Sequence, residues 1–395
     1  MKLKYLLITL IFLLTFSVSA QKLSEKATVS VVTCGPGNEL YTTFGHSAFR
    51  VNDPLQKLDK IYNYGTFNFN APNFYLNFAK GKLTYQLSTS PFSYFLRVYK
   101  YENRWVKTQE LNLSSNEVQS FYNFLENNAK PENRDYQYDF FYDNCSTKIE
   151  VIIKTILHDK VHFNNNHIVT EKSHRDLIED YTKNQKWGKF GIDLALGSVI
   201  DDIATKDEYK FLPDYIYLAV ENAVLDLNNS EKPLVKNTKT ILTSNNIYSA
   251  SFLQKVTSPF SIILLLSLVI LFLTYRNFKS YKRTKWLDFF LYFITGLVGV
   301  VVLLLWFATD HTATYKNLNF LWAFAPNIIV AFYLLKLKLP KWIITYNIIL
   351  IILIAITFII WLIKIQVFNY ALIPLFVVLI LRYLFLINFS KNIIK

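Results

Sequence analysis

Long apolar stretches and short alternating stretches divide the chain into two parts near residue 254. Beyond this point lie five apolar stretches, each close to the roughly 20 residues that a helix needs to cross a bilayer: 257–275, 286–308, 318–335, 342–363 and 367–387. They predict an all-α transmembrane bundle of about five helices within 255–395. Residues 21–226 show shorter patterns typical of an α+β domain, and the Asn-, Ser-, Thr- and Lys-rich segment 227–254 is predicted to be a linker.

The predicted domain begins with short runs rich in β-branched and aromatic residues, which are typical of strands. Turn residues such as Gly35, Pro36 and Gly37 separate the first run from the next. The strands expected on this basis cover 27–33, 42–52, 60–67, 82–88 and 104–113.

Helical spacing appears in the second half of the domain. Ser114 and Glu117 have the spacing of a capping box and predict a helix over 115–129. A stripe of isoleucines that starts at Ile149 predicts a second helix over 145–158, with Cys145 near its first turn. Residues 161–225 are expected to be mainly helical.

The first 20 residues have the pattern of a secretory signal peptide. Lys2 and Lys4 precede an apolar run, and small residues lead to Ala20. We therefore predict cleavage after Ala20 and export of the domain that follows.

Net charge first suggests a polyanion partner, but its distribution does not. The chain has a formal net charge of +13, whereas residues 21–254 carry 26 basic and 27 acidic side chains. Residues 255–395 carry 14 basic and two acidic side chains. Because a nucleic-acid binder needs a basic patch on its folded domain, no nucleic-acid partner is expected.

The basic residues instead predict the membrane topology. They concentrate in 276–285, in 336–341 and in the C-terminal tail, whereas the opposite loops hold only Lys255, Lys316 and Lys364. The positive-inside rule then places residues 21–254 outside the cytoplasmic membrane. Arg382 lies in the inner half of the last stretch and is expected to snorkel toward the interface.

The exported domain contains two cysteines, Cys34 and Cys145. A disulfide is the default for two cysteines in an oxidising compartment. The position of Cys145 at a helix start favours a nucleophile, because unpaired N–H groups and the helix dipole there lower the pKa of a thiol. Such a nucleophile needs a base, usually a histidine.

His46 is the strongest candidate for that base, although a core histidine remains the alternative reading. It lies in a predicted strand between Gly45 and Ser47. His158 and His162 have the spacing of a zinc helix but lack its glutamate, so they are interpreted as surface residues and no metal is expected.

The order of these motifs resembles a known family. A strand histidine in Phe44–Val51 followed by Asn144-Cys145 at a helix start resembles the circularly permuted branch of the papain-like NlpC superfamily, whose lipid-active example is lecithin retinol acyltransferase. The signal peptide, the membrane spans and the segments 33–37, 62–67 and 310–319 make the chain more similar to the Lnb family.

This resemblance implies a lipoprotein N-acyltransferase in the inner membrane of a Gram-negative bacterium, with its catalytic domain in the periplasm. It would move an acyl chain from a phospholipid to the α-amino group of a lipoprotein's diacylglyceryl-cysteine, without a cofactor. Cys145 would be the nucleophile and His46 the base. The orienting residue would be Tyr62, Asn63 or Tyr64, with Asn63 preferred.

Further residues are accessory candidates by the same resemblance. Asn144 and Tyr64 adjoin the expected catalytic residues, and Cys34 is either structural or a second thiol near the site. Asp310 and His311 lie in a polar outer loop over 308–317, which is either a plain connector or a contact for a headgroup or lipoprotein.

Two other functions remain open at this stage. The same cysteine–histidine pair serves cell-wall amidases and peptidases, although such an enzyme needs one membrane anchor at most. A non-enzymatic membrane sensor or assembly protein with a structural Cys34–Cys145 bridge is the third possibility.

Overall fold

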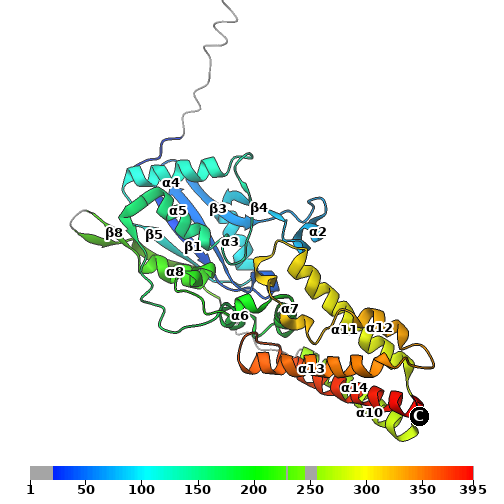
Figure 1. Ribbon diagram of the computed structural model, residues 1–395. Coiled ribbons are helices and arrows are strands. Elements are labelled where there is room, and N and C mark those ends of the chain that lie inside the picture. Colours follow the sequence, from blue (N-terminus) through cyan, green and yellow to red (C-terminus); the bar gives the residue numbers. More distant parts are fainter. Residues whose placement is uncertain (1–20, 228–229, 245–255, 395) are drawn as a thin grey trace, which may run out of the picture.

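The computed structural model describes residues 21–227, 230–244 and 256–394. The predicted signal peptide and much of the predicted linker therefore lie outside the described residues. Figure 1 shows an N-terminal domain built on a sheet and a bundle of long helices that extends from one end of it.

A seven-stranded antiparallel sheet forms the centre of the domain, in the order β10-β5-β1-β2-β3-β4-β6. Each strand run predicted from the sequence corresponds to one of its strands. The strands are β1 (Thr28–Cys34), β2 (His46–Asp53), β3 (Leu58–Thr66), β4 (Thr84–Pro91), β5 (Val106–Leu111), β6 (Asp135–Gln137) and β10 (Val235–Leu242). A smaller sheet contains β7 (Val161–His162), β8 (Val224–Asp226) and β9 (Glu231–Pro233).

Helices cover both faces of the large sheet. On one face, α4 (Ser115–Asn128), α5 (Thr147–Leu157) and α8 (Pro213–Glu221) pack their apolar side chains against Val29, Val31 and Phe49. On the other face, α3 (Phe92–Tyr101) packs against Val32 and Ile61. Because helices cover both faces, β1 is buried along almost its whole length.

A second, smaller core lies between the sheet and the membrane helices (Figure 1). Its helices are α6 (His174–Thr182), α7 (Lys186–Ala195), η3 (Ser198–Ile200) and η4 (Glu208–Phe211). Other short elements among the described residues are η1 (Leu40–Thr42), α2 (Phe74–Ala79), η2 (His158–Lys160), η5 (Thr312–Thr314), η6 (Leu318–Phe320) and η7 (Tyr370–Leu372).

Four helices among the described residues are long and apolar enough to cross a membrane. They are α10 (Pro259–Ser280), α11 (Lys285–Phe307), α13 (Trp342–Leu362) and α14 (Ile373–Ile394). The stretch 318–335, predicted as a fifth helix, is instead η6, an irregular turn and the short α12 (Asn327–Tyr333).

This broken segment packs closely along α11. A Cβ on Gly299 would lie 1.8 Å from the carbonyl oxygen of Ala323, and one on Gly296 would lie 2.2 Å from the backbone nitrogen of Ile328. The two glycines therefore allow the irregular backbone to pack directly against α11. This packing shields its polar groups from lipid, which cannot form hydrogen bonds with them. The Asn327 side chain adds hydrogen bonds to the hydroxyls of Thr295 and Tyr346.

Arg382 does not snorkel toward the interface as expected. It is fully buried, and its Nε donates to Asp288 at 2.6 Å, while Nη1 donates to Asn277. Arg283 pairs with the other oxygen of Asp288 at 3.1 Å. The charge thus stays in the bundle because α11 supplies a buried carboxylate as its partner.

The segment predicted as a linker contains regular structure. β10 extends the large sheet by pairing with β5 from Val235 to Leu242. Most of its residues are exposed, as is common for an edge strand, so it lacks the apolar alternation that identifies a strand in sequence.

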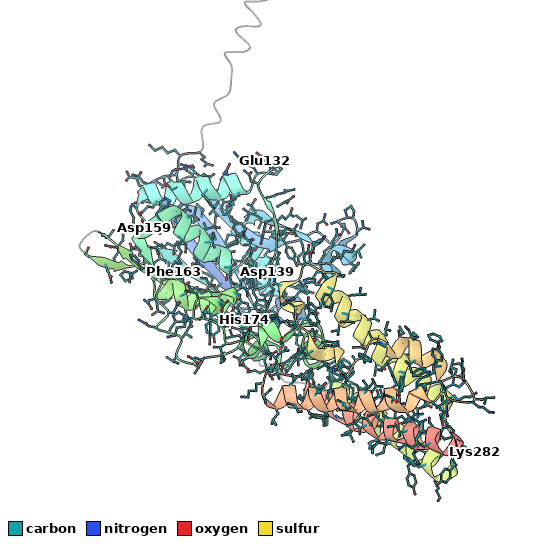
Figure 2. All side chains as sticks on the ribbon, viewed as in Figure 1. Glu132, Asp139, Asp159, Phe163, His174 and Lys282 are labelled. Atoms are coloured by element: carbon teal, nitrogen blue, oxygen red, sulfur yellow. The ribbon has the colours of Figure 1, made fainter. Side chains whose placement is uncertain are left out.

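Loops at the near end of the bundle are joined to the N-terminal domain by direct hydrogen bonds. Gly197 N–H donates to Ala313 O at 2.9 Å, and Asn317 Nδ2 donates to Leu194 O at 2.8 Å. Asn369 Nδ2 reaches Asp193 at 2.7 Å, and Asp193 also pairs with the buried Arg175. The basic loop at Lys282 lies at the opposite end of the bundle, as the charge pattern predicts (Figure 2).

Candidate active site

Cys145 lies next to the first turn of α5, two residues before the first residue of the helix. Asn144 fixes this entry into the helix. Its Oδ1 accepts from the N–H groups of Ser146 at 2.7 Å and Thr147 at 2.9 Å, and its Nδ2 donates to Phe140 O and Phe211 O. All four bonds are made inside the protein and Asn144 is buried, so its side chain holds the backbone that carries Cys145.

His46, Asn63 and Cys145 come together at one end of the sheet. His46 is the first residue of β2, and Asn63 lies on the neighbouring β3. The His46 Nε2–H donates a hydrogen bond to Asn63 Oδ1. Because an amide oxygen only accepts, this bond leaves Nδ1 of His46 for its hydrogen bond with Cys145.

The electrostatics of the pair favour a thiolate and an imidazolium. Burial alone would raise the pKa of the Cys145 thiol, but the charge and hydrogen bond of His46 outweigh it and lower the pKa. Burial alone would lower the pKa of His46, and Cys145 and Asn63 together raise it. The backbone N–H of Ser47 also donates to the sulfur. This arrangement is that of an activated cysteine nucleophile.

Two glycines make room around the pair. Gly45 has a φ of +85°, and a Cβ there would lie 2.7 Å from the Cys34 carbonyl oxygen. Gly65 has a φ of +82°, and its missing side chain leaves one flank of Cys145 open. Both positions favour glycine because L-residues rarely adopt these backbone angles.

Cys34 is a buried free thiol next to the site. It stands directly opposite His46 in the β1–β2 pair, and burial raises its pKa far above the ordinary value. Cys145 is also free, so the structure contains no Cys34–Cys145 bridge. A thiol of this kind is a packing residue rather than a nucleophile.

A cavity of about 620 Å³ opens in front of Cys145 and His46. Its volume is within the usual range for ligand sites. Its wall is mainly apolar and aromatic, and includes Phe44, Phe140, Ile178, Ile192, Leu196 and Phe211. Figure 2 shows Asp139, another residue of the wall, where the domain meets the membrane helices, with Glu132 at the opposite end.

The outer loop over 308–317 forms part of the same wall. Asp310, His311, Thr312 and Ala313 line the cavity, and Thr312 Oγ1 donates to Asp139 at 2.8 Å. The loop is therefore not a plain connector, because it closes the site from the membrane side.

Tyr64, an accessory candidate, is not part of the cavity wall. It is buried on the face of the sheet that α4 and α5 cover, and its hydroxyl accepts from Asn128 at 2.8 Å. Tyr62 likewise bonds to Glu126 on α4. Side chains alternate along a strand, so Asn63 alone of these three points the other way, toward His46.

Sequence reasoning missed Tyr85 and Tyr138, which line the cavity beside Cys145. Their rings stack with centroids 4.2 Å apart. Burial raises the pKa of Tyr138 well above its ordinary value, so its phenol stays protonated and able to donate a hydrogen bond. Aromatic residues stand at alternate positions just before Cys145: Tyr136, Tyr138 and Phe140. This sequence pattern could have indicated an aromatic wall beside the nucleophile.

The histidine pair considered for zinc does not share a helix face. His158 opens η2 after the end of α5, and His162 lies in β7. In the described parts of the chain, no three His, Cys, Asp or Glu side chains gather as a metal site would require.

The fold and the site define a membrane-anchored protein whose exported domain holds a Cys–His–Asn cluster. Two family models match the chain: the Lnb N-terminal periplasmic domain over residues 18–180 and the Lnb transmembrane domain over 251–392. The chain belongs to the Lnb family, as a membrane protein with a periplasmic domain. No curated protein and no solved structure matches it.

Proposed function

We propose that this protein is a lipoprotein N-acyltransferase of the Gram-negative inner membrane, acting on the periplasmic side. The acyl donor is a membrane phospholipid and the acceptor is the α-amino group of a lipoprotein's diacylglyceryl-cysteine. The main support for this proposal is the position of Cys145. It is hydrogen-bonded to His46 and faces an apolar cavity that the loop over 308–317 helps to close.

In the first half-reaction, the Cys145 thiolate attacks the ester carbonyl carbon of the phospholipid. A C–S bond forms and gives a tetrahedral oxyanion. When this intermediate collapses, the C–O bond breaks and the His46 imidazolium gives its proton to the departing lysophospholipid oxygen. The products are an acyl thioester on Cys145 and a lysophospholipid.

In the second half-reaction, the lipoprotein amine attacks the thioester carbonyl carbon. His46 takes the proton that the amine loses, the C–S bond breaks, and the thiolate is restored with an amide as product. The sequence of steps is ping-pong covalent catalysis. Asn63 holds His46 through both steps by accepting its Nε2–H bond.

The surroundings suit transfer rather than hydrolysis. Apolar walls exclude water from the thioester, and the loop over 308–317 supplies the polar side of the cavity. We assign Asp310, which also lies 3.6 Å from Lys82, to contact with the N–H groups of the incoming amine. His311 anchors the loop by a 2.9 Å hydrogen bond to Phe78 O.

The two alternatives fit the site less well. A cell-wall peptidase binds polar stem peptides, whereas aromatic and aliphatic side chains dominate this cavity. A sensor with a structural bridge requires bonded cysteines, whereas Cys34 and Cys145 are both free.

Trapping the acyl-enzyme tests this proposal. The purified full chain, incubated in proteoliposomes with phospholipid and no acceptor, is expected to gain the mass of one acyl chain on the peptide that contains Cys145. Hydroxylamine at neutral pH removes it, as expected of a thioester, and a synthetic diacylglyceryl-lipopeptide discharges it as an amide. No modification of Cys145 in any phospholipid would contradict the mechanism.

A further inference from the structure

The connection between β3 and β4 presents an unusual apolar surface. Four of its side chains are largely exposed: Phe69 at 61%, Tyr75 at 80%, Leu76 at 52% and Phe78 at 54%. They lie together on and beside α2, which projects from the sheet (Figure 1). Clustered exposed apolar residues of this kind mark an interaction site. We refer to residues 67–83 as the α2 hairpin.

The α2 hairpin is tied to the outer end of a membrane helix. The N–H of Asp310 donates to Lys80 O at 2.9 Å, and His311 Nε2 bonds to Phe78 O at 2.9 Å. A Cβ on Gly81 would lie 2.9 Å from the His311 backbone nitrogen, so the two backbones are in direct contact.

These contacts fix the height of the hairpin relative to a bilayer. α11 has 23 residues, about 34 Å at the rise of an α-helix, whereas the hydrocarbon core measures about 30 Å. Its last residue, Phe307, is therefore near the outer interface, and Asp310 follows three residues later. Phe307 and Trp187 are also largely exposed, as aromatic residues of an interfacial belt are.

An aromatic path connects the exposed surface with the nucleophile. Phe69 contacts Phe67 with ring centroids 4.8 Å apart, Phe67 contacts Tyr85 at 5.3 Å, and Tyr85 stacks on Tyr138 at 4.2 Å. Phe67, Tyr85 and Tyr138 line the cavity together with Cys145. Aromatic contacts thus lead from the hairpin into the cavity that contains Cys145.

We propose that the α2 hairpin inserts into the headgroup–acyl boundary of the outer leaflet and guides a phospholipid acyl chain to Cys145. The exposed surface contacts the bilayer itself, because the hairpin is bonded to the loop that follows the membrane helix α11. Lys80 and Lys82 at its base suit the phosphate level. The delivery step rests on the proposed function, whereas bilayer insertion does not.

Photo-crosslinking tests the insertion separately from catalysis. The full chain carrying Cys145→Ala and a benzophenone amino acid in place of Tyr75 is placed in phosphatidylethanolamine–phosphatidylglycerol vesicles with a radiolabelled acyl chain. The matched control replaces Leu55, which is 64% exposed. The Leu55 turn lies beside Gln21 through the Gln56–Gln21 hydrogen bond, and Gln21 O accepts from Gln119 of α4. Figure 1 shows α4 at the end of the domain away from the bundle.

Labelled lipid is expected on the Tyr75 variant at several times the level on the Leu55 variant. Equal labelling of the two would overturn the insertion. Crosslinking of position 75 to a protein, with no lipid adduct, would also overturn it and identify the surface as a protein interface.

Kinetics tests the delivery step. Tyr75→Asp with Leu76→Asp is expected to lower kcat/KM for vesicle phospholipid by about 10-fold or more, because burial of both side chains is lost. Transfer from a short-chain, water-soluble thioester should stay within about twofold of wild type, as should both reactions of Leu55→Asp. An unchanged phospholipid reaction would overturn delivery, whereas inactivity of the wild type with every donor would overturn the proposed function alone.

Discussion

Asn63 accepts a hydrogen bond from the Nε2–H of His46, seventeen residues away on the neighbouring strand. This bond fixes the tautomer and the direction of the ring, so Nδ1 faces Cys145. It also raises the pKa of His46. Asn63 is therefore a positioning residue for the base of the proposed reaction.

Replacement of Asn63 should act through His46. Asn63→Ala is expected to lower kcat by about 10- to 100-fold, part of what a general base supplies, with KM nearly unchanged. The alkaline limb of the kcat/KM profile should move to lower pH, because His46 loses a bond that favours its protonated form. Asn63→Asp keeps an oxygen acceptor and should recover most of the activity. A pH profile identical to wild type in Asn63→Ala would remove Asn63 from the mechanism.

The pH dependence of thiol alkylation should depend on His46. The pKa of Cys145 is lowered by His46 against the effect of burial, so the thiolate persists to lower pH than for an ordinary cysteine. In a Cys34→Ala background, the midpoint of iodoacetamide labelling of the His46→Ala variant should move to higher pH, because the charge and hydrogen bond of His46 no longer offset burial. The same midpoint with and without His46 would exclude a thiolate–imidazolium pair.

The junction between the domain and the bundle should depend on Arg175. This buried side chain pairs with Asp193 at 2.9 Å and Asp201 at 2.7 Å, and those aspartates bond to Asn369 and to the Val367 N–H. Arg175→Met leaves the buried Asp201 without a cation and Asp193 with only Lys189, 3.0 Å away, and should cost about 3–5 kcal/mol. Thermal unfolding of the detergent-solubilised protein measures this loss of stability.

Lys160 provides the matched control. It pairs with Glu117 at 3.2 Å and is largely exposed. Lys160→Met should cost no more than about 1 kcal/mol, as is usual for exposed ion pairs. Equal melting temperatures for the Arg175 and Lys160 variants would show that the junction does not stabilise the protein.

The broken membrane segment should depend on Gly299. A Cβ there would lie 1.8 Å from the carbonyl oxygen of Ala323, so Gly299→Ala must separate α11 from this segment and lower the melting temperature. Gly191 in α7 has no atom within 4 Å of such a Cβ, and Gly191→Ala should be neutral or stabilising by up to about 1 kcal/mol. Equal stability of both variants would contradict the close packing.

The sequence predicted those parts of the fold that depend on local pattern. The strand runs, the capping box at Ser114 and the long apolar helices all follow from spacing within a few residues. The broken segment around Pro326 and the exposed β10 did not follow, because each depends on a distant partner: α11 glycines in one case and the β5 edge in the other. Arg382 was misplaced for the same reason, since Asp288 is 94 residues away.

The candidate site was predictable to a similar extent. His46, Asn63 and Cys145 were selected from motif order, and the structure brings them together. The entry of the 308–317 loop into the cavity and the stacking of Tyr85 on Tyr138 depend on tertiary contacts that no local pattern encodes. Tyr64 was misjudged because strand alternation directs it toward Asn128 rather than toward His46.

The most direct test is the N-terminal chemistry of lipoproteins in cells that depend on this protein for N-acylation. Mass spectrometry of their N-terminal lipopeptides should show an amide-linked acyl chain with the wild-type chain. With Cys145→Ala or His46→Ala, present in the membrane at wild-type level, it should show a free α-amino group. Full N-acylation in the Cys145→Ala strain would contradict the proposed function.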